Sequence, residues 1–386
     1  MDLLSMSKLE LLERCFRIGI INCKSKNKKQ LLELITSKMP IVKPFQQEQQ
    51  EQQEQQEHPV SSLNVIDLFC GCGGMSKGLT DARLNIIAGI DVWDKAVVSY
   101  NKNFSHHQAY CEDLTQLSPE KFEELYNKDK KTVDVLVGGP PCQSFSIAGR
   151  RDKDDPRNTL FMEYVKYLDY FRPKAFIMEN VIGLLSKKTA SSENTSGEKV
   201  IDIIMELLNR EYNCIITKLY ASDFEVPQNR RRVIIIGIRK DLGIFPKEPE
   251  PVIKSVEDRI PVRTVLLRKE DVDAKYYLSE KALAGIENKR AVSKAKGFGF
   301  GAQMLDVDKP SYTIPARYWK DGYDALVKYN DKEIRRLTIL ELKRIQSFPD
   351  NYIIEGSNKD VIIQIGNAVA CKLAYHLGNY LVNTLR

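Results

Sequence analysis

Six short apolar runs, spaced along the chain from residue 62 onward, most constrain how this protein can fold. They cover residues 65–69, 86–90, 133–137, 175–178, 214–219 and 233–238. Apolar runs of this length, rich in β-branched residues, predict buried strands. Segments with helical patterns lie between the earlier runs, and strands that alternate with helices favour a parallel sheet covered on both faces. We therefore predict an α/β protein with a doubly wound sheet.

The last two runs are separated only by residues 220–232, which leaves no room for a crossover helix. We therefore expect them to form an antiparallel pair that closes the sheet. From about residue 249 to 330 the alternation disappears, and glycine, lysine and tyrosine become frequent. This segment predicts a small irregular second domain. After it, Thr338 and Glu341 form a capping box that opens a helix closed by Pro349, and residues 361–381 are another helical stretch. The chain would return there to the first domain, which comprises residues 62–248 and 331–386.

The chain begins with a segment of different composition. Residues 46–57 consist of glutamine and glutamate alone, cannot bury apolar surface, and predict a linker over residues 43–61. Residues 1–42 contain two short amphipathic helical patterns and a basic stretch at 24–29, which predict a small helical module. This module weakly resembles the SAP-type helix-turn-helix of DNA-associated proteins. A structural or protein-contact role fits the same pattern.

Bulk properties narrow the class of protein. Lysine and arginine outnumber aspartate and glutamate by 58 to 52, a net charge of +6 that suits a polyanionic partner or an ordinary basic surface. No apolar run is long enough to span a bilayer, and no signal segment opens the chain. The eight cysteines show no regular pairing, and neither they nor the four histidines have metal-ligand spacing. We expect a soluble intracellular protein, in cytoplasm or nucleus, with reduced thiols and no metal.

One cysteine occupies a distinctive loop. The run at 133–137 is followed by Gly138, Gly139, Pro140, Pro141 and Cys142. Prolines stiffen the backbone, glycines let ligand atoms come close, and the carboxyl end of a strand is where open α/β sheets bind ligands. The loop could therefore display Cys142 as a nucleophile, although a cysteine in such a loop is more often inert.

A glycine-rich turn at residues 67–74 follows the first run and precedes a helical pattern, as nucleotide-binding loops do. Its spacing departs from GxGxxG, and a simple turn is the alternative. Asp91 ends the next strand, placed to accept from ribose hydroxyls. Trp93 could pack on an adenine face, and Asp113 could accept from its amino group, although core or surface roles are open for each.

Six blocks taken together resemble the motifs of the cytosine-C5 DNA methyltransferases, in order and spacing, over residues 62–386. They are DLFCGCGG at 67–74, GGPPCQSFS at 138–146, MENV at 178–181, QNRRR at 228–232, RRLTILELKRIQSFPD at 335–350 and GNAV at 366–369. The resemblance implies S-adenosylmethionine as cofactor and a cytosine in duplex DNA as substrate, with the methyl group moved to carbon 5. It also suggests a restriction-modification setting and a monomer, with neither membrane nor metal.

The resemblance implies four catalytic residues, and the chemistry explains their types. Carbon 5 of cytosine is a poor nucleophile, so the Cys142 thiolate would first add at carbon 6. Glu179 would hydrogen-bond ring nitrogen 3 and the exocyclic amine, a role that suits a desolvated, partly protonated carboxyl; a strand-end salt bridge is its alternative. Arg230 and Arg232 alternate, so both should face the base or an adjacent phosphate, with Arg231 facing away.

The resemblance also implies residues for the cofactor and the DNA. The cofactor set is Phe69, Gly71, Cys72, Gly74, Asp91, Val92, Trp93, Asp113, Leu114, Pro140, Asn367 and Val369, with capping of a helix as the alternative for Asn367. The DNA set is Gln143, Ser146, Arg150, Arg151, Thr313 and Arg317. The target base must leave the stack, and the segment 144–158 has the small and basic residues of a loop that closes over it.

Two other functions fit parts of the pattern. A tRNA cytosine-5 methyltransferase of the same family would share the thiolate chemistry. Ser144 to Ser146 favour DNA, and so does the second domain at 249–330, which resembles the family's target-recognition domain. A catalytically silent DNA-binding regulator would not need Cys142, Glu179 and Arg232, which are all present.

Overall fold

The structure, a computed structural model, describes residues 7, 8, 11, 26–32, 63–141, 160–188, 199–295, 302–320 and 322–386. The chain divides into two compact units, Met1–Pro59 and Val60–Arg386. In the first unit, residues 28–32 are helical. Asn27 and Gln30 open this helix, because the side chain of each accepts the backbone N–H of the other, at 3.1 and 2.9 Å. Leu31, on the predicted apolar face, is buried.

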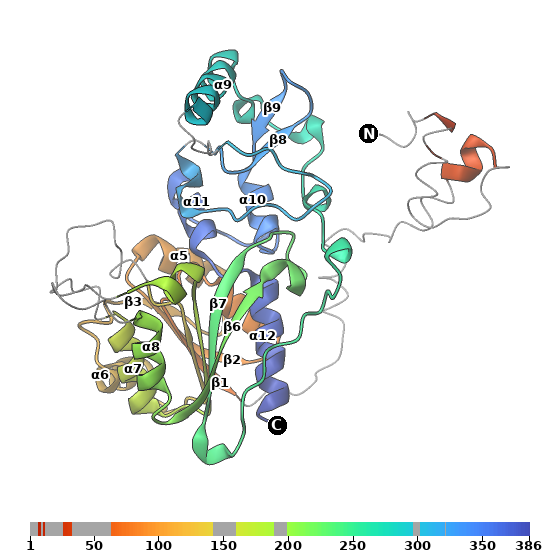
Figure 1. Cartoon of the computed structure of the whole chain (residues 1–386). Helices are drawn as coiled ribbons and strands as arrows, with labels where there is room; N and C mark the ends of the chain where they lie inside the picture. Colours follow the sequence, from red (N-terminus) through yellow and green to blue (C-terminus); the bar gives the residue numbers. More distant parts are fainter. Residues whose placement is uncertain are drawn as a thin grey trace. The chain divides into compact units, whose positions relative to one another are not determined.

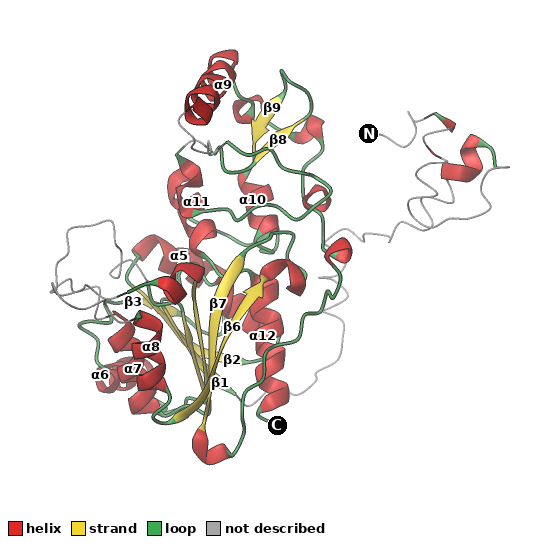
Figure 2. Ribbon diagram, in the orientation of Figure 1, coloured by secondary structure: helices red, strands yellow, loops and turns green. Residues whose placement is uncertain are grey.

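A seven-stranded sheet in the order β3-β2-β1-β4-β5-β7-β6 forms the centre of the second unit (Figures 1 and 2). Its strands are β1 Asn64–Leu68, β2 Asn85–Asp91, β3 Ala109–Cys111, β4 Val135–Gly138, β5 Ala175–Val181, β6 Tyr212–Tyr220 and β7 Arg231–Arg239. The doubly wound α/β prediction is confirmed. Strand β3 is missing from the six predicted strands because only three residues pair, too few to form a recognisable apolar run.

Strands β6 and β7 are antiparallel, as predicted, and β7 lies between β5 and β6. Its central residues 233–236 are wholly buried, since the sheet is covered on both faces there. Because β7 runs against β5, its first residues lie beside the carboxyl end of β5, where Val181 pairs with Arg232. This register brings the QNRRR block to the end of the MENV strand.

Helices cover both faces of the sheet. Residues of α4 (Gly74–Asp81) and α12 (Cys371–Thr384) build one apolar cluster with the strands. Residues of α6 (Pro119–Tyr126), α7 (Leu160–Phe171) and α8 (Val200–Leu208) build the cluster on the other face, as Figure 2 shows. Helix α5 (Asp94–Asn103) follows β2 and packs through Val97 and Tyr100.

The region predicted to be irregular contains more regular structure than expected. It holds the helix α9 (Glu280–Ala295), rich in alanine, lysine and glutamate, and the strand β8 (Leu326–Lys328), which pairs with β9 (Ile334–Arg336). The predicted capping box at Thr338 and Glu341 is confirmed and opens α10 (Ile339–Ile345). Apolar residues of α10 and α11 (Asn358–Asn367) share one cluster with Val262, Leu305, Ile314 and Tyr318. The sequence analysis assigned these two helices to the first domain, with the sheet, whereas their apolar residues pack against the second domain.

Short 3₁₀ helices connect the larger elements. They are η4 Ile182–Ser186, η5 Ala221–Phe224, η6 Lys240–Leu242, η7 Val256–Asp258, η8 Val262–Thr264, η9 Lys269–Asp271, η10 Ala274–Tyr276 and η11 Ala316–Trp319.

The single helical stretch predicted over residues 361–381 is wrong. The backbone is extended at Ala368 and Ala370, with ψ of 148° and 130°, so α11 ends at Asn367 and α12 begins at Cys371. The break lets α12 turn onto α4, where the Cys371 carbonyl lies so close to Gly78 that a Cβ there would meet it at 2.2 Å. It also presents residues 367–369 to the pocket described next.

Candidate active site

A pocket of about 820 Å³ opens at the carboxyl ends of β1, β2, β4 and β5. Ligands of open α/β sheets bind at this edge. Most of the lining residues come from four of the six sequence blocks and from the segments that follow β2 and β3. They include Phe69, Gly71, Cys72, Asp91, Val92, Trp93, Asp113, Leu114, Pro140, Pro141, Glu179, Asn367 and Val369. Eleven of the twelve predicted cofactor residues therefore lie on one cavity.

The glycine-rich turn after β1 has a left-handed backbone at Phe69 and Gly71, with φ of 60° and 53°. Such a φ is uncommon for a residue like Phe69 and occurs more often at functional sites. A Cβ built on Gly71 would meet no described atom within 4 Å, so the turn leaves open space beside its backbone. These two residues shape one wall of the pocket.

Asp91 holds this turn in place. One carboxylate oxygen accepts the backbone N–H of Gly71 at 2.8 Å, and the other accepts that of Trp93 at 2.9 Å. Burial raises the pKa of Asp91, which these backbone hydrogen bonds oppose. Each carboxylate oxygen retains a second lone pair, so Asp91 can still accept from a ligand hydroxyl.

Gly74 is the predicted cofactor residue that lies outside the lining of the described pocket. It is the first residue of α4, and a Cβ there would lie 2.3 Å from the Val369 carbonyl oxygen. Gly74 therefore allows α4 to approach the segment after α11 closely. Close packing against Val369 therefore explains why a glycine occupies position 74.

Asp113 is oriented by its own turn. Its Oδ1 accepts from the backbone N–H of Thr115 at 2.9 Å and from the Thr115 hydroxyl at 2.8 Å. The side chain is exposed at the pocket, beside buried Leu114. An oriented carboxylate next to an apolar side chain can select a ring that carries an amino group.

The approach to Cys142 is anchored by Asn180. The Asn180 amide donates to the Pro140 carbonyl at 3.0 Å and accepts the Val181 N–H at 2.9 Å. Asn180 is buried, and both Pro140 and Pro141 line the pocket. Cys142, Gln143, Ser146, Arg150 and Arg151 lie outside the described residues, so their predicted roles remain predictions.

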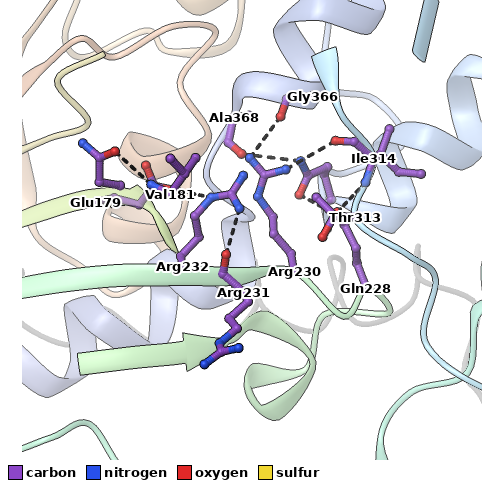
Figure 3. A network of polar contacts seen from close by, with 12 residues as sticks. Glu179, Val181, Gln228, Arg230, Arg231, Arg232, Thr313, Ile314, Gly366 and Ala368 are labelled. Atoms are coloured by element: carbon purple, nitrogen blue, oxygen red, sulfur yellow. Dashed lines mark hydrogen bonds and ion pairs between the residues drawn. The ribbon is translucent and has the colours of Figure 1, made fainter. Parts of the chain in front are cut away.

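Glu179 and Arg232 form an ion pair at the pocket wall, shown in Figure 3. The Arg232 Nε lies 2.7 Å from the Glu179 carboxylate, but its N–H does not point at that oxygen, so the contact is an ion pair without an aligned hydrogen bond. Glu179 thus occupies both predicted environments, the pocket and a strand-end salt bridge. Arg231 points away, as predicted, and lies over the Tyr220 ring at 5.3 Å.

Arg230 points to the same side as Arg232 but is almost completely buried (Figure 3). It donates to the Gly366 carbonyl at 3.0 Å and, more weakly, to the Ile314 carbonyl at 3.4 Å. It contributes nothing to the lining of the pocket as described. The structure therefore does not place Arg230 where the predicted contact to a base or phosphate would be made.

The two predicted DNA residues of the second domain lie apart from the pocket. The Thr313 hydroxyl donates to the Asn229 carbonyl at 3.3 Å, beside the QNRRR block. Arg317 is exposed and pairs with Asp324 at 2.6 Å. Asn367 ends α11, whereas the N-cap of α12 is Ala370, so Asn367 does not cap α12 as the alternative role required.

Asp67 is a pocket residue that the sequence analysis did not single out. It is buried, and its Oδ2 accepts from the Ser76 hydroxyl at 2.7 Å, which in turn accepts from Tyr100 at 2.8 Å. Burial raises the pKa of Asp67 to about 7. Its position next to the glycine-rich turn could have marked it, but its burial depends on α4 and α5.

Replacing Asp67 with asparagine should flatten part of the pH dependence of stability. The folded pKa of about 7 lies above the ordinary value of 3.8, so between these values the folded protein binds more protons than the unfolded chain. Its free energy of unfolding then falls as pH rises. In urea titrations, the free energy of unfolding of Asp67→Asn should rise relative to that of the wild type by up to about 1.4 kcal/mol per pH unit between pH 4 and 7. Above pH 7 the difference between the two proteins should stay constant. A constant difference across the lower range as well would contradict the assignment.

No group of three or more metal-ligating side chains occurs among the residues that the structure describes. Within those same residues, no helix combines the length and the apolar composition needed to cross a membrane.

Comparison with known families shows to which family the chain belongs. Residues 63–383 match the family model described as C-5 cytosine-specific DNA methylase. The chain belongs to this family. The match covers all six sequence blocks, including the four that contribute residues to the pocket wall.

Members of the family give the same result. The chain is 33% identical to the type II methyltransferase M1.ScrFI of Lactococcus lactis subsp. cremoris, over 83% of this chain and 78% of the relative. It is 32% identical to the type II methyltransferase M.DdeI of Desulfomicrobium norvegicum, over 82% and 87%. Among solved structures, a putative DNA modification methyltransferase from an Escherichia coli prophage matches with a TM-score of 0.64 and 25% identity, over 84% and 99% of the two chains. The Dnmt2 methyltransferase of S. pombe shares the fold, with a TM-score of 0.66 and 21% identity.

Proposed function

We propose that the protein transfers a methyl group from S-adenosylmethionine to carbon 5 of a flipped cytosine, at a specific site in duplex DNA, through a covalent Cys142 adduct. One observation carries this proposal. The glycine-rich turn, Glu179 with its ion-pair partner Arg232 behind it, and Pro140 and Pro141 before Cys142 are brought together, and all but Arg232 line the same pocket. A cofactor and a base bound there would share one pocket.

The pocket fits the proposed cofactor. Its volume of about 820 Å³ falls in the range of small-molecule sites. Gly71 leaves open space, Asp91 offers acceptors for ribose hydroxyls, and Asp113 offers an acceptor for the adenine amino group. Trp93 and Leu114 supply apolar surface for the ring. When bound, S-adenosylmethionine supplies an electrophilic methyl group.

The chain supplies the activation of cytosine. The Cys142 thiolate adds to carbon 6 and makes carbon 5 nucleophilic. Glu179 hydrogen-bonds ring nitrogen 3 and the amine, which draws charge from the ring during the addition. Arg232 holds Glu179 in position and favours negative charge nearby. After methylation, loss of the carbon 5 proton releases Cys142 for the next turnover.

The DNA must present an extrahelical base to this pocket. Gln143, Ser146, Arg150 and Arg151 follow Cys142 in the chain and would contact the extruded nucleotide and its strand. Thr313 and Arg317 would contact the duplex from the second domain. The type II relatives favour a restriction-modification setting for this monomeric, soluble enzyme.

Replacing Asp91 with asparagine should weaken cofactor binding by about 10- to 100-fold. Gly71 and Trp93 donate to different oxygens of Asp91, so an asparagine side chain in the same orientation would present its amino group to one of their N–H groups. Calorimetric titration with S-adenosylhomocysteine measures the effect. The control Asp94→Asn alters an exposed carboxylate outside the described pocket lining and should bind normally. Equal affinities for the two variants would exclude this role of Asp91.

Bisulfite sequencing of DNA from cells that express the protein tests the function and gives its recognition site. We expect methylated cytosines at one sequence, and none in cells that express Cys142→Ala. Methylation of tRNA with none on duplex DNA would favour the tRNA enzyme instead. A cofactor-dependent covalent complex with duplex DNA containing 5-fluorocytosine would exclude a silent regulator, because fluorine blocks loss of the carbon 5 substituent.

A further inference from the structure

Arg230 lies where three segments of the chain meet. Its guanidinium joins the Gly366 carbonyl at the end of α11 to the Ile314 carbonyl of the second domain, at 3.0 and 3.4 Å. The side chain is 2% exposed, and its Nε has no hydrogen-bond partner within the described part of the chain. A buried guanidinium with two carbonyl partners connects backbone segments and has no surface to offer DNA.

The two segments that Arg230 joins are also in direct backbone contact. A Cβ built on Gly366 would lie 2.5 Å from the Ala316 nitrogen and 2.7 Å from the Pro315 carbonyl carbon. Only glycine permits this approach, because any side chain would force the segments apart. Gly366 directly precedes Asn367, Ala368 and Val369, which all line the pocket.

Two buried glutamines, Gln228 and Gln346, complete the connection (Gln228 is drawn in Figure 3). We call Gln228, Arg230 and Gln346 together the junction. Gln228 accepts the Ile314 N–H at 3.0 Å and donates to the Gln346 side chain at 3.1 Å. Gln346 donates to the Ile365 carbonyl at 2.8 Å. The junction thus ties residues 311–316 to the residues that precede the pocket wall.

We propose that Arg230 is a positioning residue that couples occupancy of the cofactor pocket to ordering of residues 311–316, which carry Thr313. A cofactor that contacts residues 367–369 restricts the carbonyl of Gly366. Because the same guanidinium holds Ile314, ordering the first segment lowers the entropy cost of ordering the second. This inference rests on the proposed function, since it requires a cofactor in the pocket.

Charge supports this assignment. Burial, with the nearby Arg232 cation, lowers the pKa of Arg230 to about 9, so the side chain is still a cation at neutral pH. Glu179 is the neighbouring opposite charge, and Arg232 lies between Arg230 and Glu179 in Figure 3. Loss of the Arg230 guanidinium should therefore affect Glu179 on the pocket wall as well as Ile314 in the second domain.

Hydrogen exchange of the full-length chain, with and without S-adenosylhomocysteine, tests the coupling. In the wild type, ligand should slow exchange of the 311–316 amides at least about fivefold, the lower end of typical coupling between sites. Arg230→Lys keeps a positive charge but lacks the planar fork whose two terminal nitrogens each reach one carbonyl, so the ligand-induced slowing should drop below twofold. Arg231→Lys, at an exposed neighbour of the same type, should behave as wild type.

Gly366→Ala provides an independent second variant, because its methyl group separates the two segments without altering charge. It should also lose the ligand-induced slowing. Full slowing in either variant, or equal slowing across residues 326–336 of β8 and β9, would overturn the coupling through Arg230. Failure of the wild type to bind S-adenosylhomocysteine would instead overturn the proposed function. Binding without slowing at 311–316 would overturn only this inference.

Discussion

Cys142→Ala should abolish methyl transfer, with a loss of at least about 10⁴-fold, while leaving cofactor affinity within about twofold of the wild type. Removal of a covalent nucleophile costs rates of this order, because binding contributions alone remain. Cofactor affinity should persist because the residues proposed to contact the cofactor belong to other segments, apart from Pro140, whose carbonyl stays anchored by Asn180. Transfer of tritium from labelled S-adenosylmethionine to duplex DNA measures turnover, and calorimetry with S-adenosylhomocysteine measures affinity.

Cys111→Ala is the matched control for this experiment. Cys111 is an exposed thiol at the end of β3, outside the lining of the described pocket, so its loss should leave turnover unchanged. Retained turnover in Cys142→Ala would reject the covalent mechanism. Equal loss in both variants would show that the assay responds to general thiol loss and would remove the support for Cys142 as nucleophile.

Glu341→Ala should destabilise the protein by about 3–5 kcal/mol. Glu341 and Arg335 are both fully buried and form a bidentate pair, at 2.8 and 2.9 Å. Glu341 also accepts the backbone N–H groups of Leu267 and Thr338, at 2.9 and 2.7 Å. Its removal leaves a buried guanidinium without its carboxylate partner and two N–H groups without acceptors. Urea unfolding followed by circular dichroism measures the loss.

A double variant separates the pair from its surroundings. Arg335→Met with Glu341→Leu removes both charges and replaces them with apolar side chains of similar volume, which often costs less than breaking such a pair. We expect this variant to be more stable than Glu341→Ala. A loss below about 1 kcal/mol for Glu341→Ala would show that the pair contributes little.

The sequence was sufficient for the sheet and most of the pocket wall because both depend on local signals. Asp91 and Glu179 each follow or end a recognisable strand, and strand ends meet at one edge of a doubly wound sheet. The helix opened by Thr338 was predictable for the same reason, since a capping box lies within four residues.

Contacts between residues far apart in the chain could not be predicted from the sequence. Alternation along β7 predicted the side to which Arg230 points, but its burial comes from Ile314 and Gly366, 84 and 136 residues away in the chain. The pKa of Asp67 similarly depends on enclosure by helices that follow β1 and β2. Gly74 looked like a cofactor residue from its motif, yet its packing against Val369 is visible only in three dimensions.

The reversed direction of β7 determines which sequence changes the active site can accept. In a parallel arrangement, the start of β7 would lie at the opposite edge of the sheet, roughly 20 Å from Glu179. A shift of one residue between β5 and β7 would bring Arg231, whose side chain points away, to the place of Arg232. The nine pairs between β6 and β7 oppose such a shift. A change of length between η4 and α8 would alter neither strand, so the chain can vary in length there without changing the register that brings Arg232 to Glu179.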